Sequence, residues 1–156
     1  MTSVKVRRVE SRLVDVVCEI TLQDPYERIT SPDVIARVFS FLEDRPQEEL
    51  WALYLNGSSN IIGARQVSVG TANSSLLHPR EVFGPAVRFG AVSVVVVHNH
   101  PSGDGVIPSW EDLAATSRIF QSGELLGIPL IDHVVVGHRG FCSIRQQYPE
   151  RFDQTR

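Results

Sequence analysis

The amino-acid sequence predicts an α/β fold, in which helices flank one mixed β-sheet within a single domain. Three observations predict it. Runs rich in β-branched and aromatic residues alternate along the chain with segments of helical periodicity. The apolar run at 92–98 has the character of a central strand that is covered on both faces. The length of 156 residues is enough for one domain with a real hydrophobic core.

The first half of the chain begins with a strand-rich extension, predicted over residues 1–28, in which valines alternate with charged residues between Val4 and Leu22. A helix begins after Ser31, because serine is a preferred N-cap and Pro32 suits the first helical position. This helix ends before Pro46. The turn at 56–60 then separates two strands of a predicted hairpin, 50–55 and 61–69.

The second half alternates helices and strands. A helix is predicted from Pro79 to about Phe89, and Pro85 must either kink it or make it begin late. The strand at 92–98 follows, and then a helix from Ser109 to about Leu126, which Gly127 and Pro129 end. Two short strands close the domain, at 130–136 and 141–145, around a turn at 137–140.

Composition limits the environment and the partners. The net charge is −3 and the pI is about 5.9, so charge does not support association with DNA. The chain begins with polar and charged residues, and no apolar run approaches the length of about 20 residues that spans a bilayer. The two cysteines, Cys18 and Cys142, are too few for a disulfide framework and are expected to be buried apolar residues. We therefore expect a cytoplasmic protein without a membrane segment.

The most informative residues stand at the end of the central strand. Successive side chains of a strand alternate between faces, so His98 and His100 should point to one side and Asn99 to the other. Asp112 follows in the first turn of the next predicted helix. Two imidazoles and one carboxylate leave one position of a tetrahedral zinc open, which is the catalytic arrangement. The alternatives are two hydrogen-bonded core histidines, and an Asp112 that only forms a capping box with Ser109.

These residues also carry a resemblance to a known family. The passage His98-Asn99-His100-Pro101-Ser102-Gly103-Asp104 with Pro108-Ser109-Trp110-Glu111-Asp112-Leu113 resembles the metal-binding motif of the RadC-like proteins, which are bacterial members of the JAMM (MPN-plus) metallopeptidase superfamily. Further similar segments lie at 48–56, 69–71, 78–82 and 123–133. The resemblance covers roughly residues 29–145. It implies a single MPN domain over 29–156, with the cytidine-deaminase-like sandwich of a mixed sheet and flanking helices.

The resemblance also implies a chemistry and its residues. His98, His100 and Asp112 would bind Zn²⁺, and Ser109 would orient the site and stabilise an oxyanion. Glu48 would be the general base that takes a proton from water during cleavage of an amide bond in a protein or peptide substrate. Glu49 is a second candidate for the base, but strand alternation should turn it to the opposite face.

The spacing of the third ligand departs from the family pattern. That pattern places seven residues between the second histidine and the serine and ten before the aspartate, whereas this chain has eight and eleven. The strict spacing selects Glu111. We prefer Asp112, because the local Pro-Ser-x-Glu-Asp pattern is intact and the loop at 105–107 can absorb an insertion. Asp104 also stays open.

Two other functions compete with a metallohydrolase. One is a DNA-repair-associated or DNA-processing protein. The letters His-Asn-His suggest an HNH nuclease, but that motif spreads its residues along a ββα unit. Residues 1–56 contain no glycine, so the glycine-bearing helix-hairpin-helix that often precedes RadC-like domains is not expected there. The other is a metal-binding scaffold without catalysis. His133 is expected to serve packing or a surface hydrogen bond, and neither His78 nor His138 is assigned any chemistry.

Overall fold

A computed structural model describes residues 20, 27–70, 77–101 and 105–153. The strand-rich character predicted for Val4–Leu22 therefore lies outside the described residues, apart from Ile20. Five strands form one mixed sheet in the order β2-β1-β3-β4-β5, in which only β3 and β4 pair in parallel. Their bounds are β1 Glu49–Leu55, β2 Ile61–Val69, β3 Ser93–Asn99, β4 Leu130–Gly137 and β5 Gly140–Ser143. The predicted α/β fold with a mixed sheet is confirmed.

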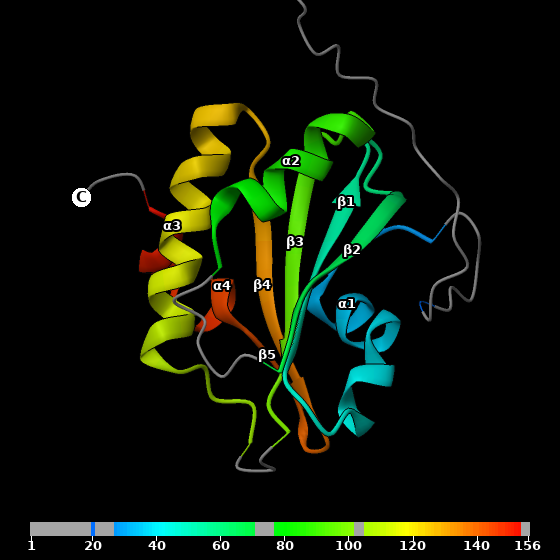
Figure 1. The fold of residues 1–156 in the computed structure, drawn as a ribbon, viewed down its shortest axis with the longest axis vertical. Coiled ribbons are helices and arrows are strands. Elements are labelled where there is room, and N and C mark those ends of the chain that lie inside the picture. Colours follow the sequence, from blue (N-terminus) through cyan, green and yellow to red (C-terminus); the bar gives the residue numbers. More distant parts are fainter. Residues whose placement is uncertain (1–19, 21–26, 71–76, 102–104, 154–156) are drawn as a thin grey trace, which may run out of the picture.

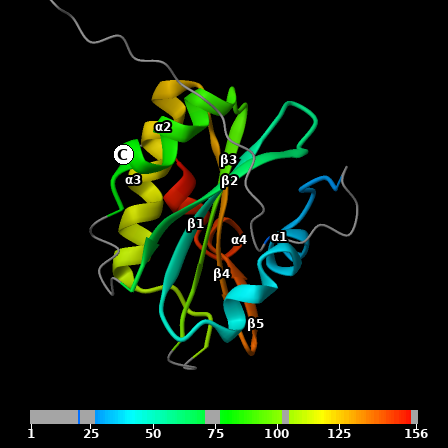
Figure 2. The same ribbon diagram turned by 45° about the vertical axis from the view of Figure 1, so that its right-hand side comes forward.

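The helices lie on both faces of this sheet (Figures 1 and 2). Figure 2 shows α2 and α3 on one side of the strands and α1 on the other. The helices are α1 Pro32–Val38, α2 Pro79–Phe89, α3 Trp110–Leu126 and α4 Ile144–Gln147, and two 3-10 turns span Ser40–Asp44 and Pro149–Phe152. None of the described helices has the length and apolar character that a membrane span requires.

The central strands β1 and β3 are buried along their whole length, because each face packs against a separate apolar cluster. Leu50, Ala52 and Tyr54 of β1 face α2 and α3, whereas the alternate residues Trp51 and Leu53 face α1. Strand β3 divides its valines in the same way. This two-sided burial is the physical reason for its continuous apolar run.

Two element boundaries differ from the sequence prediction, those of the first helix and of the last strand. The first helix ends at Val38, and the chain continues into the 3-10 turn instead of extending α1. Helix α2 has the predicted bounds, Pro79–Phe89, and Pro85 lies inside it rather than at a late start. The last strand ends at Ser143, because the Ser143 hydroxyl accepts a hydrogen bond from the Gln146 N–H and caps α4.

The parallel pairing of β3 with β4 determines where functional side chains can meet. A parallel pair needs a crossover, and α3 supplies it between β3 and β4. The chain leaves the carboxyl end of β3 at Asn99 and enters α3 at Trp110, beside that end. The end of β3 and the first turn of α3 are therefore neighbours, at the edge of the sheet where α/β proteins bind ligands.

Candidate metal centre

The two histidines of the His-x-His pattern point to the same side, as predicted. His98 belongs to β3 and is completely buried, and it faces α3 like Val96 two residues earlier. His100 is the first residue after Asn99, where the strand ends, and it is partly buried. The Nε2 atoms of the two rings are 3.0 Å apart.

Asp112 is held by the capping box that the sequence predicts at the start of α3. The Asp112 N–H donates to Ser109 Oγ at 3.1 Å, and Asp112 Oδ2 accepts from Ser109 N–H and Ser109 Oγ, each at 2.8 Å. The carboxylate is buried, although Ser109 is exposed. Capping therefore directs the carboxylate beyond the end of the helix, toward the end of β3.

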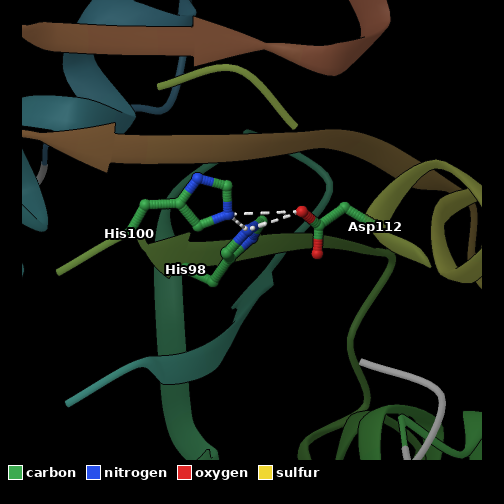
Figure 3. Close-up of side chains that lie close together, drawn as sticks. All are labelled: His98, His100 and Asp112. Atoms are coloured by element: carbon green, nitrogen blue, oxygen red, sulfur yellow. Dashed lines mark hydrogen bonds and ion pairs between the residues drawn. The ribbon is translucent and has the colours of Figure 1, made fainter. Parts of the chain in front are cut away.

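His98, His100 and Asp112 converge on one point (Figure 3). Asp112 Oδ2 lies 3.4 Å from His98 Nε2 and 3.3 Å from His100 Nε2, which closes a triangle with the 3.0 Å separation of the two nitrogens. Among the described residues, these three form the group of possible ligands that could hold a metal ion. The two roles that the sequence suggests for Asp112, helix capping and metal binding, are therefore compatible, because the capping carboxylate also faces both imidazoles.

Charge and burial act in opposite directions within this cluster. Burial alone raises the pKa of Asp112, but its hydrogen bond with His100, the ring of His98 beside it and the hydrogen bond from the Ser109 N–H outweigh burial and hold this pKa well below its usual range. The pKa of His100 is raised, first by its hydrogen bond to Asp112 against the effect of burial, and further by the negative charges of Asp112 and Glu48. The carboxylate is therefore ionised, and the cluster favours positive charge beside it.

His133 is the site residue that the sequence analysis missed. It is buried in β4, and its Nε2 lies 2.8 Å from His98 Nδ1. Its other nitrogen, Nδ1, lies 2.7 Å from Thr116 Oγ1 in α3. Burial, followed by the charge of His98, lowers the pKa of His133 to about 3, so its ring is neutral. The burial agrees with the expected packing, but the expected surface hydrogen bond was wrong, because the hydrogen bonds of His133 are buried and one of them reaches a candidate ligand.

Glu49 lies on the face of Trp51, away from the candidate ligands, as strand alternation predicts. Glu49 is buried, and its Oε2 accepts hydrogen bonds from Trp51 Nε1 at 3.0 Å and Gln66 Nε2 at 2.7 Å. Glu48 precedes β1 and is partly buried. Leu50 pairs with His98 in the antiparallel register, so the same register continued by two residues brings Glu48 opposite His100. Its effect on the pKa of His100 agrees with this placement.

The alternatives for the third ligand are separated by their positions. Glu111 is exposed and does not belong to the cluster, although it stands at the strict family spacing. Asp104 lies outside the described residues. The extra residue is accommodated before Ser109, since the capping box is complete.

Two cavities differ in their relation to the cluster. A small one, of about 40 Å³, opens beside His100 and is lined by Gly105 and the β4–β5 turn, including His138 and Arg139. A larger one, of about 320 Å³, lies against α1, Asp132 and Arg145 and contains none of the three possible ligands. Of these two cavities, only the small one is therefore next to the cluster.

The fold and the site together define an α/β domain with a possible His-His-Asp metal centre at the end of its central strand. Comparison with known proteins agrees: the chain belongs to the family described as the RadC-like JAB domain, which matches residues 29–149. The resemblance seen in the sequence is thereby confirmed.

The relatives are named only as UPF0758 proteins. One from Geobacter sulfurreducens is 45% identical over 118 residues, which cover 75% of this chain and 51% of the relative. One from Desulforamulus reducens is 42% identical and covers 74% and 50%, and one from Staphylococcus haemolyticus is 41% identical and covers 77% and 53%. The chain thus spans about half the length of these relatives.

Proposed function

We propose that this domain is a zinc-dependent metallohydrolase that cleaves an amide bond in a peptide or isopeptide, like the JAMM peptidases that it resembles. The observation that carries the proposal is the triangle of His98 Nε2, His100 Nε2 and Asp112 Oδ2, whose edges measure 3.0, 3.3 and 3.4 Å. With bonds of 2.0–2.1 Å, the ligand atoms of a tetrahedral zinc lie about 3.3 Å apart. The three atoms therefore fit one face of a zinc tetrahedron.

The donor set also favours zinc on chemical grounds. Two imidazole nitrogens and one carboxylate oxygen suit zinc better than the hard cations Mg²⁺ and Ca²⁺, which prefer oxygen ligands. Three protein ligands leave a fourth position for water or substrate. When bound, zinc supplies Lewis acidity and a water whose pKa is near neutrality.

Glu48 is the proposed general base. Its place opposite His100 in the continued register, and its effect on the pKa of that ring, support a carboxylate within reach of the attacking water. Glu48 would accept the proton of this water and return it to the leaving nitrogen. Glu49 is unsuited to this role, because its carboxylate is buried on the other face and accepts bonds from Trp51 and Gln66.

Ser109 is proposed to orient the site. Its hydroxyl donates to Asp112 Oδ2 and also accepts from the Asp112 N–H, so it fixes the carboxylate against the end of α3. The oxyanion role that the resemblance implies requires this hydroxyl to release Asp112 and donate to substrate instead. The orienting role needs no such change.

Zinc content tests the ligand set directly. Protein purified without chelator should contain about one equivalent of zinc, measured by elemental analysis. Asp112→Asn should reduce this content, because an anionic ligand is replaced by a neutral one. Glu111→Gln is the matched control and should leave it unchanged, since Glu111 is exposed outside the cluster. Loss of zinc in Glu111→Gln, with zinc retained in Asp112→Asn, would move the third ligand to Glu111.

Turnover tests the base. Glu48→Gln should keep zinc and lose activity by about 10²- to 10⁴-fold, because the amide has similar size but cannot accept a proton. The assay is cleavage of a peptide library, including lysine isopeptides, followed by mass spectrometry. Equal activity of Glu48→Gln and wild type would contradict the assigned base. Zinc-loaded wild type that cleaves none of these substrates would favour the non-catalytic scaffold.

A further inference from the structure

A chain of buried hydrogen bonds connects His98 to the backbone of α3. From the candidate centre outward, it joins His98 Nδ1 to His133 Nε2 at 2.8 Å, and His133 Nδ1 to Thr116 Oγ1 at 2.7 Å. It ends where Thr116 Oγ1 donates to the Asp112 carbonyl oxygen at 2.7 Å. His98, His133 and Thr116 are all buried, so these groups rely on one another for hydrogen bonds.

The last bond fixes the direction of every other bond in this chain. A carbonyl oxygen can only accept, so the hydroxyl proton of Thr116 must point at the Asp112 carbonyl. Thr116 Oγ1 then accepts from His133 Nδ1–H. In the neutral ring of His133, Nε2 carries no proton and accepts from His98 Nδ1–H. His98 Nε2 is left with a free lone pair, directed at His100 and Asp112.

We propose that His133 and Thr116 are positioning residues that set the tautomer of His98 and so prepare its Nε2 to bind metal. The inference rests on the metal centre proposed above and adds two residues to it. Metal-binding histidines commonly donate their other N–H to a protein acceptor, which fixes the ring and its tautomer. Here the acceptor is a second imidazole, itself fixed by a threonine one helical turn after Asp112.

The direction of these hydrogen bonds explains why a hydroxyl is needed at position 116. Without the hydroxyl, His133 Nδ1–H would face an apolar group, and the ring would favour the other tautomer, with Nε2 protonated. That proton would donate to His98 Nδ1 and place the remaining proton of His98 on Nε2. Zinc would then compete with a proton for its ligand atom.

The test compares three variants of the full chain. Thr116→Val removes the hydroxyl with little change of shape. It should lower the affinity for Zn²⁺ by about 10- to 100-fold, as mutation of the outer-shell residues that orient a metal ligand commonly does. Thr116→Ser keeps a hydroxyl and should restore wild-type affinity. Ser117→Ala is the matched control, because the Ser117 hydroxyl likewise bonds a backbone carbonyl one turn earlier but is not part of the chain. Affinity is measured with Zn²⁺ alone against a chromophoric chelator.

A second measurement reads the tautomer without any metal. In metal-free protein with ¹⁵N-labelled histidine, long-range ¹H–¹⁵N spectra should show His98 protonated at Nδ1 in wild type and shifted toward Nε2 in Thr116→Val. Wild-type His98 protonated at Nε2, or unchanged Zn²⁺ affinity in Thr116→Val, would overturn the inference. Absence of amide cleavage would refute the hydrolase alone, because neither measurement depends on turnover. Absence of zinc binding would refute the centre and leave the tautomer measurement decisive.

Discussion

Asn99, the middle residue of His-Asn-His, offers a sharp test of how the segment before β1 is held. Its side chain points away from the histidines, and Oδ1 accepts from the Glu49 N–H at 2.7 Å. Its Nδ2 donates to the Gln47 carbonyl at 3.1 Å. These two bonds hold the backbone on both sides of Glu48. Asn99→Ala should therefore loosen Glu48 without touching the candidate ligands.

The size of the effect follows from the burial of the two partners. Glu49 is buried, so its N–H is left without an acceptor, at a cost of about 1–3 kcal/mol. Gln47 is exposed, so water can replace the lost donor, and that bond accounts for about 0.5–1.5 kcal/mol. The free energy of unfolding should fall by about 1.5–4.5 kcal/mol, which corresponds to about 3–18 °C in Tm for a chain of this size.

Urea denaturation in the presence of chelator is the appropriate assay, because bound metal would add its own stabilisation. The matched control is Asn56→Ala. Asn56 Oδ1 also accepts two backbone N–H groups, from Ser58 at 2.9 Å and Asn60 at 3.0 Å, but in a surface turn where water can replace it. The control should lose less stability than Asn99→Ala, because neither of its N–H groups is left without an acceptor. If Asn99→Ala is as stable as Asn56→Ala, the two bonds do not clamp this segment.

Two further predictions concern the core. Gly123→Ala in α3 should lower the free energy of unfolding, measured with urea, by about 1–2 kcal/mol. Alanine has the better helix propensity, but its Cβ would lie 2.6 Å from the Ile128 carbonyl oxygen and 3.1 Å from the Phe83 ring. Equal or higher stability of the variant would contradict this packing. Burial raises the pKa of Tyr54 well above its usual range, so the stability that it contributes is complete below about pH 10 and is lost as the pH rises above this value. Tyr54→Phe should therefore lose less stability than wild type between about pH 9 and pH 12, and parallel losses would disprove the shift.

Much of the site could be predicted because it depends on local geometry. Alternation along a strand places His98 and His100 on one face, whatever the rest of the fold does. The capping box fixes Asp112 against Ser109 within a single turn of helix. For the same reason the capping pattern, and not the count of loop residues, predicts which carboxylate lies beside the two histidines, namely Asp112 rather than Glu111.

The contact of His133 could not be predicted, because it depends on long-range register. β4 pairs with β3 only after the crossover through α3, and the pairing contains an irregularity between Val94 and Val95. One residue of difference in this register would turn His133 to the α1 face. Nothing local distinguishes it from Asp132, which lines the cavity on the α1 side and accepts a bond from the Ser143 hydroxyl. The one hint in the sequence was that His133 is a histidine within an apolar strand, where a buried ring needs a hydrogen-bond partner.

Asp112, in the first turn of α3, makes three kinds of contact that together orient the candidate metal centre. Asp112 caps α3 with its carboxylate, faces the histidines with the same Oδ2 atom, and anchors Thr116 with its carbonyl. The positive end of the helix dipole favours its negative charge. Folding of α3 therefore orients two of the three candidate ligand atoms, since Thr116 is connected to His98 through His133. His100 stands after the end of β3 and is only partly buried, so it is the candidate ligand with the least support from the fold.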